Sequence, residues 1–153
     1  RMALNRDNMR SFKQLSIDDQ GRIEQVKAFF KLVEEFSKKK AYHYEIRQDN
    51  EECLNLVCRI LFVIDGTHKM GLEFNKCDIN FRDFEISNPS LTIRTNLNNM
   101  IDSILHNFDD LGKHLRGKDR SEFDLAASLV NYIGDYLTSL SEDSSYNHPN
   151  TRH

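Results

Sequence analysis

The stretch Cys53–Ile64 has the most informative distribution of apolar and polar positions in this chain. Its sequence is CLNLVCRILFVI, which begins as an alternation and then becomes apolar at successive positions. A strand with one solvent-exposed face keeps alternating, whereas a strand covered on both faces is a continuous apolar run. The pattern therefore predicts a strand whose second half is covered on both sides of its sheet.

Alternation with a period of two predicts three further strands, at Tyr42–Gln48, His68–Phe74 and Ile79–Ile86. The apolar residues of the last segment change parity, which predicts a β-bulge near Arg82. The dipeptide Asp65-Gly66 is typical of a tight hairpin turn. Short turns between consecutive strands indicate a four-stranded antiparallel meander.

Apolar residues at helical spacing predict three helices, at Asp18–Lys39, Ser90–Leu115 and Ser121–Leu140. The apolar set of the last helix covers about half of its circumference, which is wider than a one-sided stripe. We expect this helix either to be wedged between two elements or to form half of a dimer contact. The first helix is expected to cover one sheet face and the later pair the other, unless a second subunit supplies the cover.

The order of these elements indicates an α+β fold, with a single domain over residues 16–140 and flexible tails at 1–15 and 141–153. The chain has 153 residues, of which 39% are hydrophobic and 29% charged, as expected for a globular protein. The formal net charge of −3 lacks the basic excess typical of a dedicated duplex binder. No apolar run approaches the roughly 18–20 residues that span a bilayer, so a membrane partner is not expected.

The three cysteines are Cys53, Cys58 and Cys77. Cys53 and Cys58 would point to opposite faces of one strand and cannot pair with each other. We expect three reduced thiols, which is typical of a cytoplasmic protein.

Acidic and histidine side chains recur every four residues along the second predicted helix, at Asp102, His106, Asp110 and His114. This spacing places potential metal ligands on one helical face. On a helical wheel they lie opposite the apolar stripe, which favours an ordinary solvated face. His106, Asp110 and His114 remain an alternative site for a metal-dependent hydrolase.

Basic and aromatic residues cluster where the first helix is expected to end, at Lys38, Lys39, Lys40, Tyr42 and Tyr44. Aromatic faces can stack on bases while lysines neutralise phosphates, so this cluster is an alternative nucleic-acid site. Lysines at a helix C-terminus also complement its dipole, and half-buried tyrosines are ordinary in a strand.

The chain has no recognisable nucleophile motif or phosphate-binding loop, and no cofactor is expected. We interpret it as a non-enzymatic protein-interaction module of the cytoplasm and as a homodimer. It would be a stoichiometric binder of the inhibitor, immunity, anti-defence or chaperone type. The wide apolar arc of the last helix makes Leu125, Leu129, Tyr132 and Tyr136 the predicted contact residues.

Overall fold

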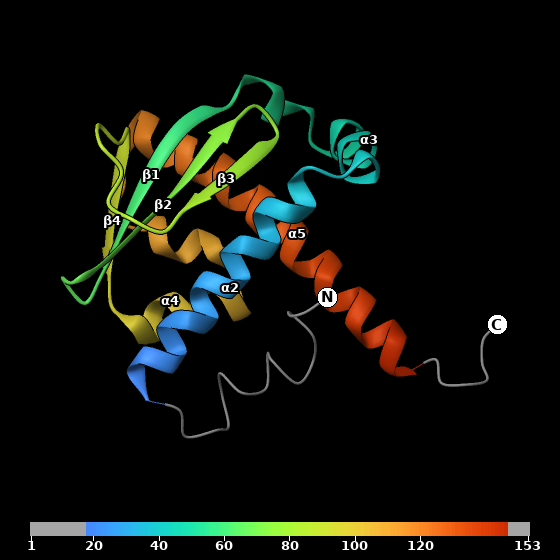
Figure 1. Cartoon of the computed structure of the whole chain (residues 1–153). Coiled ribbons are helices and arrows are strands. Elements are labelled where there is room, and N and C mark those ends of the chain that lie inside the picture. Colours follow the sequence, from blue (N-terminus) through green and yellow to red (C-terminus); the bar gives the residue numbers. More distant parts are fainter. Residues whose placement is uncertain (1–17, 147–153) are drawn as a thin grey trace.

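The computed structural model describes residues 18–146, without the side chains of 47 and 140–146, and has an α+β fold with a four-stranded mixed sheet (Figure 1). Of the predicted tails at 1–15 and 141–153, residues 1–15 and 147–153 lie outside the described residues. The elements are α2 (Asp19–Ser37), α3 (Lys40–Asp49), the 3-10 helix η1 (Glu51–Asn55), β1 (Val57–Ile64), β2 (His68–Asn75), β3 (Asp78–Arg82), β4 (Leu91–Thr95), α4 (Leu97–Leu105), the 3-10 helix η2 (Phe108–Gly112) and α5 (Gly117–Tyr146).

The strand order is β3-β2-β1-β4. β1 pairs antiparallel with β2, and β2 pairs antiparallel with β3, as the sequence predicted. The prediction of a purely antiparallel meander is wrong, because β4 lies parallel to β1. β3 and β4 therefore form the two edges of the sheet, and the chain between them must cross one of its faces.

The hairpin between β1 and β2 is confirmed. Asp65 and Gly66 have φ values of 55° and 73°. Two successive positive φ values give a tight turn the twist that matches the flanking strands, which explains the preference for Asp-Gly there.

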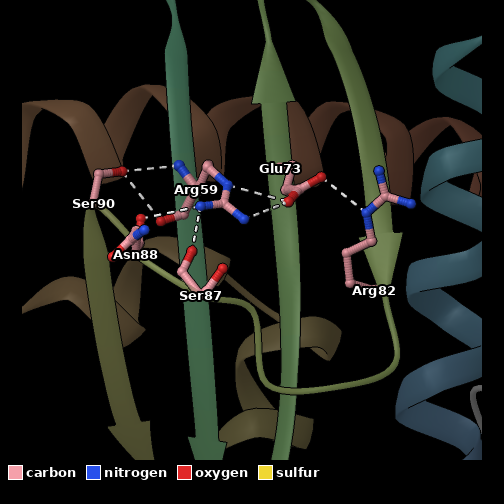
Figure 2. A network of polar contacts seen from close by, with 6 residues as sticks. All are labelled: Arg59, Glu73, Arg82, Ser87, Asn88 and Ser90. Carbon is pink, nitrogen blue, oxygen red and sulfur yellow. Dashed lines mark hydrogen bonds and ion pairs between the residues drawn. The ribbon is translucent and has the colours of Figure 1, made fainter.

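The described helices cover one face of the sheet, here named the inner face (Figure 2). Phe62 of β1 stacks on Phe30 of α2 with ring centroids 5.8 Å apart, and it meets Phe108 of η2 edge-on at 5.9 Å. Phe108 in turn stacks on Phe123 of α5. This chain of rings joins the sheet to the helices in one core, so the predicted division of helices between two faces is wrong.

The second half of β1 is nevertheless covered on both sides, as predicted. On the outer face, Leu61 and Val63 are buried in a small cluster with Ile86. Ile86 belongs to the segment 83–90, which crosses β2 and β1 on its way from β3 to β4 (Figure 2). We call this segment the strap. The outer cover of this half of β1 is therefore a segment of the chain itself rather than a helix.

The strap also corrects the predicted strand at Ile79–Ile86. β3 ends at Arg82, and the following residues leave the sheet without forming a bulge. The parity change in the sequence arises because Ile86 packs onto the sheet from the strap, whereas Phe81 points inward from the strand.

The predicted strand at Tyr42–Gln48 is also wrong, because these residues lie in α3. Tyr42 and Ile46 are buried, and their spacing of four fits a helix and a strand equally well. The helix places Tyr44 away from them, and this ring is 69% exposed. The predicted strand at Cys53–Ile64 also begins too early, because its apolar spacing fits a short helix as well. Residues 53–55 lie in η1, and β1 begins at Val57.

The predicted helix at Ser90–Leu115 is divided into β4, α4 and η2. Leu91 and Ile93 point to the core from β4. Asn96 then caps α4 by accepting a hydrogen bond from the Asn99 N–H at 2.8 Å. The first and third predicted helices are confirmed as α2 and α5, although α5 continues beyond residue 140 into the predicted tail.

The cysteines differ from the prediction of three reduced thiols. Cys53 in η1 and Cys77 in the turn between β2 and β3 form a disulfide with their Cα atoms 5.0 Å apart. Cys58 is buried as a free thiol, and burial raises its pKa to about 12. None of the helices within residues 18–146 is long and apolar enough to cross a bilayer.

Candidate functional site

The two edges of the sheet differ in how their backbone groups are satisfied. At the β3 edge, the Ser37 hydroxyl accepts a hydrogen bond from the Ile79 N–H at 3.0 Å, and its single hydrogen is shared between the Glu34 carbonyl at 2.8 Å and the Ile79 carbonyl at 3.1 Å. The Phe81 N–H donates to the Glu34 carboxylate at 3.4 Å. Ser37 and Glu34 both belong to α2, so this helix closes the β3 edge with its own side chains.

The β4 edge is open. The Thr95 carbonyl accepts from the Asp65 N–H at 2.9 Å and therefore faces β1. Because backbone groups alternate in direction along a strand, Thr92 and Arg94 direct their N–H and C=O groups away from the sheet. No hydrogen bond from the described part of the chain reaches these outward groups. β4 is an edge strand of the sheet, and in Figure 1 no helix lies on its outer side.

A groove of about 700 Å³ lies beside the C-terminal half of β4. It is bordered by β4, by α4 and by the segment that contains η2 and the residues after it. Its lining residues are Arg94, Thr95, Asn96, Asn99, Asp102, Ser103, Asp110, Leu111, Lys113 and His114. We call this surface, together with the open edge of β4, the β4 groove.

The wall of the β4 groove formed by α4 is held by local hydrogen bonds. The Leu97 N–H donates to the Asp65 carboxylate at 3.3 Å, and the Ser103 hydroxyl donates to the Asn99 carbonyl at 2.8 Å. With the Asn96 cap, these bonds tie the helix to the hairpin and to the end of β4. The groove is therefore bordered by ordered structure on this side.

The charged side chains of the β4 groove have both signs. Within residues 18–146, none of them takes part in an ion pair. They are therefore available to a bound molecule, and the groove suits a polar partner rather than an apolar one. They are Arg94, Lys113 and His114 against Asp102 and Asp110.

Of the four contact residues predicted on the last helix, one lies in the core, two lie at its margin and one is exposed. Leu129 is 0% exposed, and Leu125 and Tyr132 pack against the core as partly buried side chains. Tyr136 keeps 39% of its surface and meets Phe36 edge-on at 5.4 Å. The wide apolar arc is thus explained by burial against several elements of the same chain, and Leu129 has no surface to offer a partner.

The Tyr132 hydroxyl donates a hydrogen bond to the Glu45 carboxylate of α3 at 3.1 Å. Burial, this bond and the charge of Glu45 together raise the pKa of Tyr132 to about 12. Tyr132 therefore links α5 to α3 within the chain, which is a structural role.

The basic and aromatic residues proposed as a nucleic-acid site are not brought together. Tyr42 is buried, and its hydroxyl donates to the Cys77 carbonyl at 2.9 Å, whereas Tyr44 is exposed. Burial and the charge of Asp78 raise the pKa of Tyr42. The two rings therefore offer no common stacking surface.

The lysines of this cluster are also separated in their contacts. Lys38 donates to the Asn80 side chain at 3.0 Å, and the Lys39 ammonium lies 5.6 Å from the centre of the Phe36 ring. Lys40 is exposed at the start of α3. Lys38 thus joins the end of α2 to β3, whereas Lys39 makes a local contact with a residue of α2 itself.

The helical spacing behind the metal hypothesis is lost, because α4 ends at Leu105. His106 borders a cavity of about 30 Å³ beside Phe29 and Phe108, whereas Asp110 and His114 line the β4 groove. Among residues 18–146, no three His, Cys, Asp or Glu side chains gather closely enough to hold a metal ion.

A network on the outer face fixes the strap (Figure 2). The Arg59 guanidinium donates to the Glu73 carboxylate at 3.0 Å and also to the backbone carbonyls of Ser87 and Asn88. The Ser90 hydroxyl accepts from the Arg59 N–H at 2.8 Å, and Ser90 N–H donates to the Arg59 carbonyl at 2.9 Å. Arg59 thereby fixes the point at which the strap becomes β4.

Glu73 is shared between two arginines, since Arg82 donates to its second oxygen at 2.9 Å. Burial alone would raise the pKa of Glu73, but the hydrogen bonds from Arg82 and Arg59 and their charges lower it overall. The carboxylate thus stays ionised and holds β1, β2 and β3 together on the outer face.

The β4 groove was missed in the sequence. The segment Ser90–Thr95 has the sequence SLTIRT, in which Leu91 and Ile93 alternate with Thr92 and Arg94. This period of two, with its β-branched residues, indicates a strand. The helical spacing of the residues that follow concealed it, because β4 passes directly into α4.

Comparison of the chain with protein-family models, with curated proteins and with solved structures finds no significant match.

Proposed function

We propose that the protein is a non-enzymatic protein-interaction module that binds a partner protein stoichiometrically at the β4 groove. The observation that supports this proposal is the contrast between the two sheet edges. Side chains of α2 close the β3 edge, whereas the outward backbone groups of Thr92 and Arg94 stand open beside a groove of about 700 Å³. An open strand edge is a template for pairing with another chain, and folds that do not use it cover it.

The balance between hydrogen-bond energy and ordering entropy indicates that side chains of the groove must contribute to binding. Thr92 and Arg94 offer four outward backbone groups, and each new hydrogen bond contributes about 1 kcal/mol net. Ordering a flexible partner segment costs roughly 1–2 kcal/mol per residue. The edge alone therefore does not hold such a segment, and contacts to Arg94, Lys113 and the other groove residues must supply the difference.

The kind of binder proposed is the one expected from the sequence, namely an inhibitor, immunity, anti-defence or chaperone type. A homodimer remains part of the proposal. We do not extend it to the cytoplasmic location expected from the sequence, because Cys53 and Cys77 form a disulfide and disulfides persist mainly in oxidising compartments. A homodimer would need an interface other than Leu129, which is buried within the monomer.

The test compares three baits in affinity capture followed by reconstitution with purified components. The baits are the wild-type chain, the double variant Arg94→Glu/Lys113→Glu, and the variant Lys40→Glu as a charge-reversal control on distant α3. A partner retained by wild type and Lys40→Glu but lost by the double variant supports the proposal. A partner that binds all three equally contradicts the β4 groove as the binding site.

A further inference from the structure

We propose that the partner presents an extended segment that joins the sheet as a fifth strand beside β4 and places an acidic side chain opposite Arg94. This inference rests on the proposed function and specifies the chemistry of the partner at the same groove. It names an extended peptide segment of another protein as the occupant.

The backbone geometry of β4 fits strand addition. Its outward groups come from Thr92 and Arg94, which are two residues apart and so repeat at roughly 6.6–6.8 Å along the edge. An incoming strand repeats its own outward groups at the same interval, so both residues can pair in one register. β1 already fixes the other side of β4, which holds these groups in an extended conformation before binding.

The side-chain chemistry of this edge favours an acidic partner residue. Arg94 projects on the outer face next to Val63, and no described carboxylate pairs with its guanidinium. A neighbouring strand brings one side chain to within about 5 Å of Cβ of the residue opposite, where unlike charges stabilise the pair. A glutamate or aspartate at that position would meet Arg94 directly.

Alternate side chains of the incoming strand would point to the inner face, over the part of the β4 groove lined by α4 and by the segment around η2. Asn99, Asp102 and Lys113 lie there beside the largely buried Leu111. These neighbours favour polar side chains able to form hydrogen bonds over large apolar ones. We therefore infer a segment that is extended, polar and acidic at one position.

A second copy of the chain fits this edge less well. If two β4 strands paired antiparallel about Ile93, Thr92 of each copy would lie opposite Arg94 of the other. Such pairing satisfies the backbone but leaves both arginines without a counter-charge. An acidic segment of another protein satisfies the backbone and the charge together.

The test uses a displayed library of random twelve-residue peptides, selected on the intact wild-type protein with the disulfide formed. Selected peptides are then labelled and titrated against four variants. Thr92→Pro removes one outward N–H at an edge position that tolerates proline, and Thr92→Val keeps that N–H and serves as its control. Arg94→Glu reverses the proposed charge contact, and Lys40→Glu is its control.

The proposal expects acidic peptides whose affinity falls about tenfold or more with Thr92→Pro and with Arg94→Glu, and stays within about threefold of wild type with either control. Replacing the acidic peptide residue by lysine should restore affinity for Arg94→Glu. As a measurement independent of variant folding, hydrogen exchange at the Thr92 and Arg94 amides of the wild-type protein should slow when the peptide is added.

A library that yields no binder, or binders indifferent to Thr92→Pro, overturns strand addition. If in either case the binding of captured partner proteins is still lost in the variant Arg94→Glu/Lys113→Glu, the proposed function stands. Only the proposal of strand addition is then wrong. Light scattering that shows a wild-type dimer, converted to monomer by Thr92→Pro, overturns the proposal in favour of a second copy.

Discussion

Ile86 lies directly over Gly71, and a Cβ added at Gly71 would come within 2.8 Å of Ile86 Cγ2. Gly71 sits in β2 opposite Leu61, so the missing side chain leaves the space in which the strap packs against the sheet. The strap thereby covers part of the outer face of the sheet and leads the chain from β3 to β4. The position of β4, and hence of the β4 groove, depends on this contact.

Replacing Gly71 by alanine should therefore destabilise the fold by about 1–3 kcal/mol, because the added methyl group overpacks the contact with Ile86. Chemical unfolding of the variant measures the change. The double variant Gly71→Ala/Ile86→Ala should show a favourable coupling between the two sites, since the second change removes the clashing atoms. Gly134→Ala is the control, because its Cβ would lie 3.7 Å from the Phe29 ring, an ordinary contact distance. Equal losses for both glycine variants would contradict this account of the strap.

Cys53 and Cys77 are separated by 24 positions and should stabilise the protein through their bond. The variant Cys53→Ser/Cys77→Ser should lose about 2–4 kcal/mol of unfolding free energy, since the open chain gains conformational freedom on unfolding. Thiol counting provides a second measurement. The unfolded protein without reductant should react at Cys58 alone, and the folded protein should react slowly because burial raises the pKa of that thiol. Three reactive thiols without reductant would show that the disulfide is absent.

Glu73→Gln should cost about 1–2 kcal/mol at pH 7, because it removes the charge that both Arg59 and Arg82 contact. The folded pKa of Glu73 is lowered from its ordinary value of 4.5. Its ionised form therefore stabilises the fold fully above that value, and the contribution is lost as the pH falls through the folded pKa. Urea unfolding of both proteins should show the difference shrinking below pH 4. Glu85→Gln, which loses an exposed ion pair with Lys69, should change stability by less than about 0.5 kcal/mol. A difference that grows towards acid pH would contradict the assignment.

Leu129→Ala should destabilise the monomer by about 2–5 kcal/mol without changing its association state, because the side chain is wholly buried. Leu125→Ala should cost less, since Leu125 is only partly buried. Chemical unfolding and light scattering measure the two quantities separately. If Leu129→Ala instead dissolved an oligomer and left stability unchanged, the interface expected from the sequence would be supported.

Segments controlled by neighbours in the chain were predicted well from the sequence. The helix predicted to begin at Asp18 begins at Asp19 with Asp18 as its cap, and the predicted Asp65-Gly66 hairpin turn has the positive φ values of such a turn. The continuous apolar run of β1 correctly indicated cover on both faces. In each case the signal lies within a few residues, because capping, turn geometry and side-chain periodicity are local properties of the backbone.

In other segments the local sequence is compatible with more than one secondary structure, and only the tertiary structure decided between them. Tyr42 and Ile46 are compatible with a strand or a helix, and burial of the Tyr42 ring against the Cys77 turn accompanies the helix. Leu91 and Ile93 form a strand because they pair with β1, about thirty positions away in the chain. Cys53 forms a disulfide with Cys77 rather than with the nearer Cys58. The open edge of β4 follows from that pairing. Contacts between distant segments select among conformations that local energies leave nearly equal, so the candidate site exists only once the chain has folded.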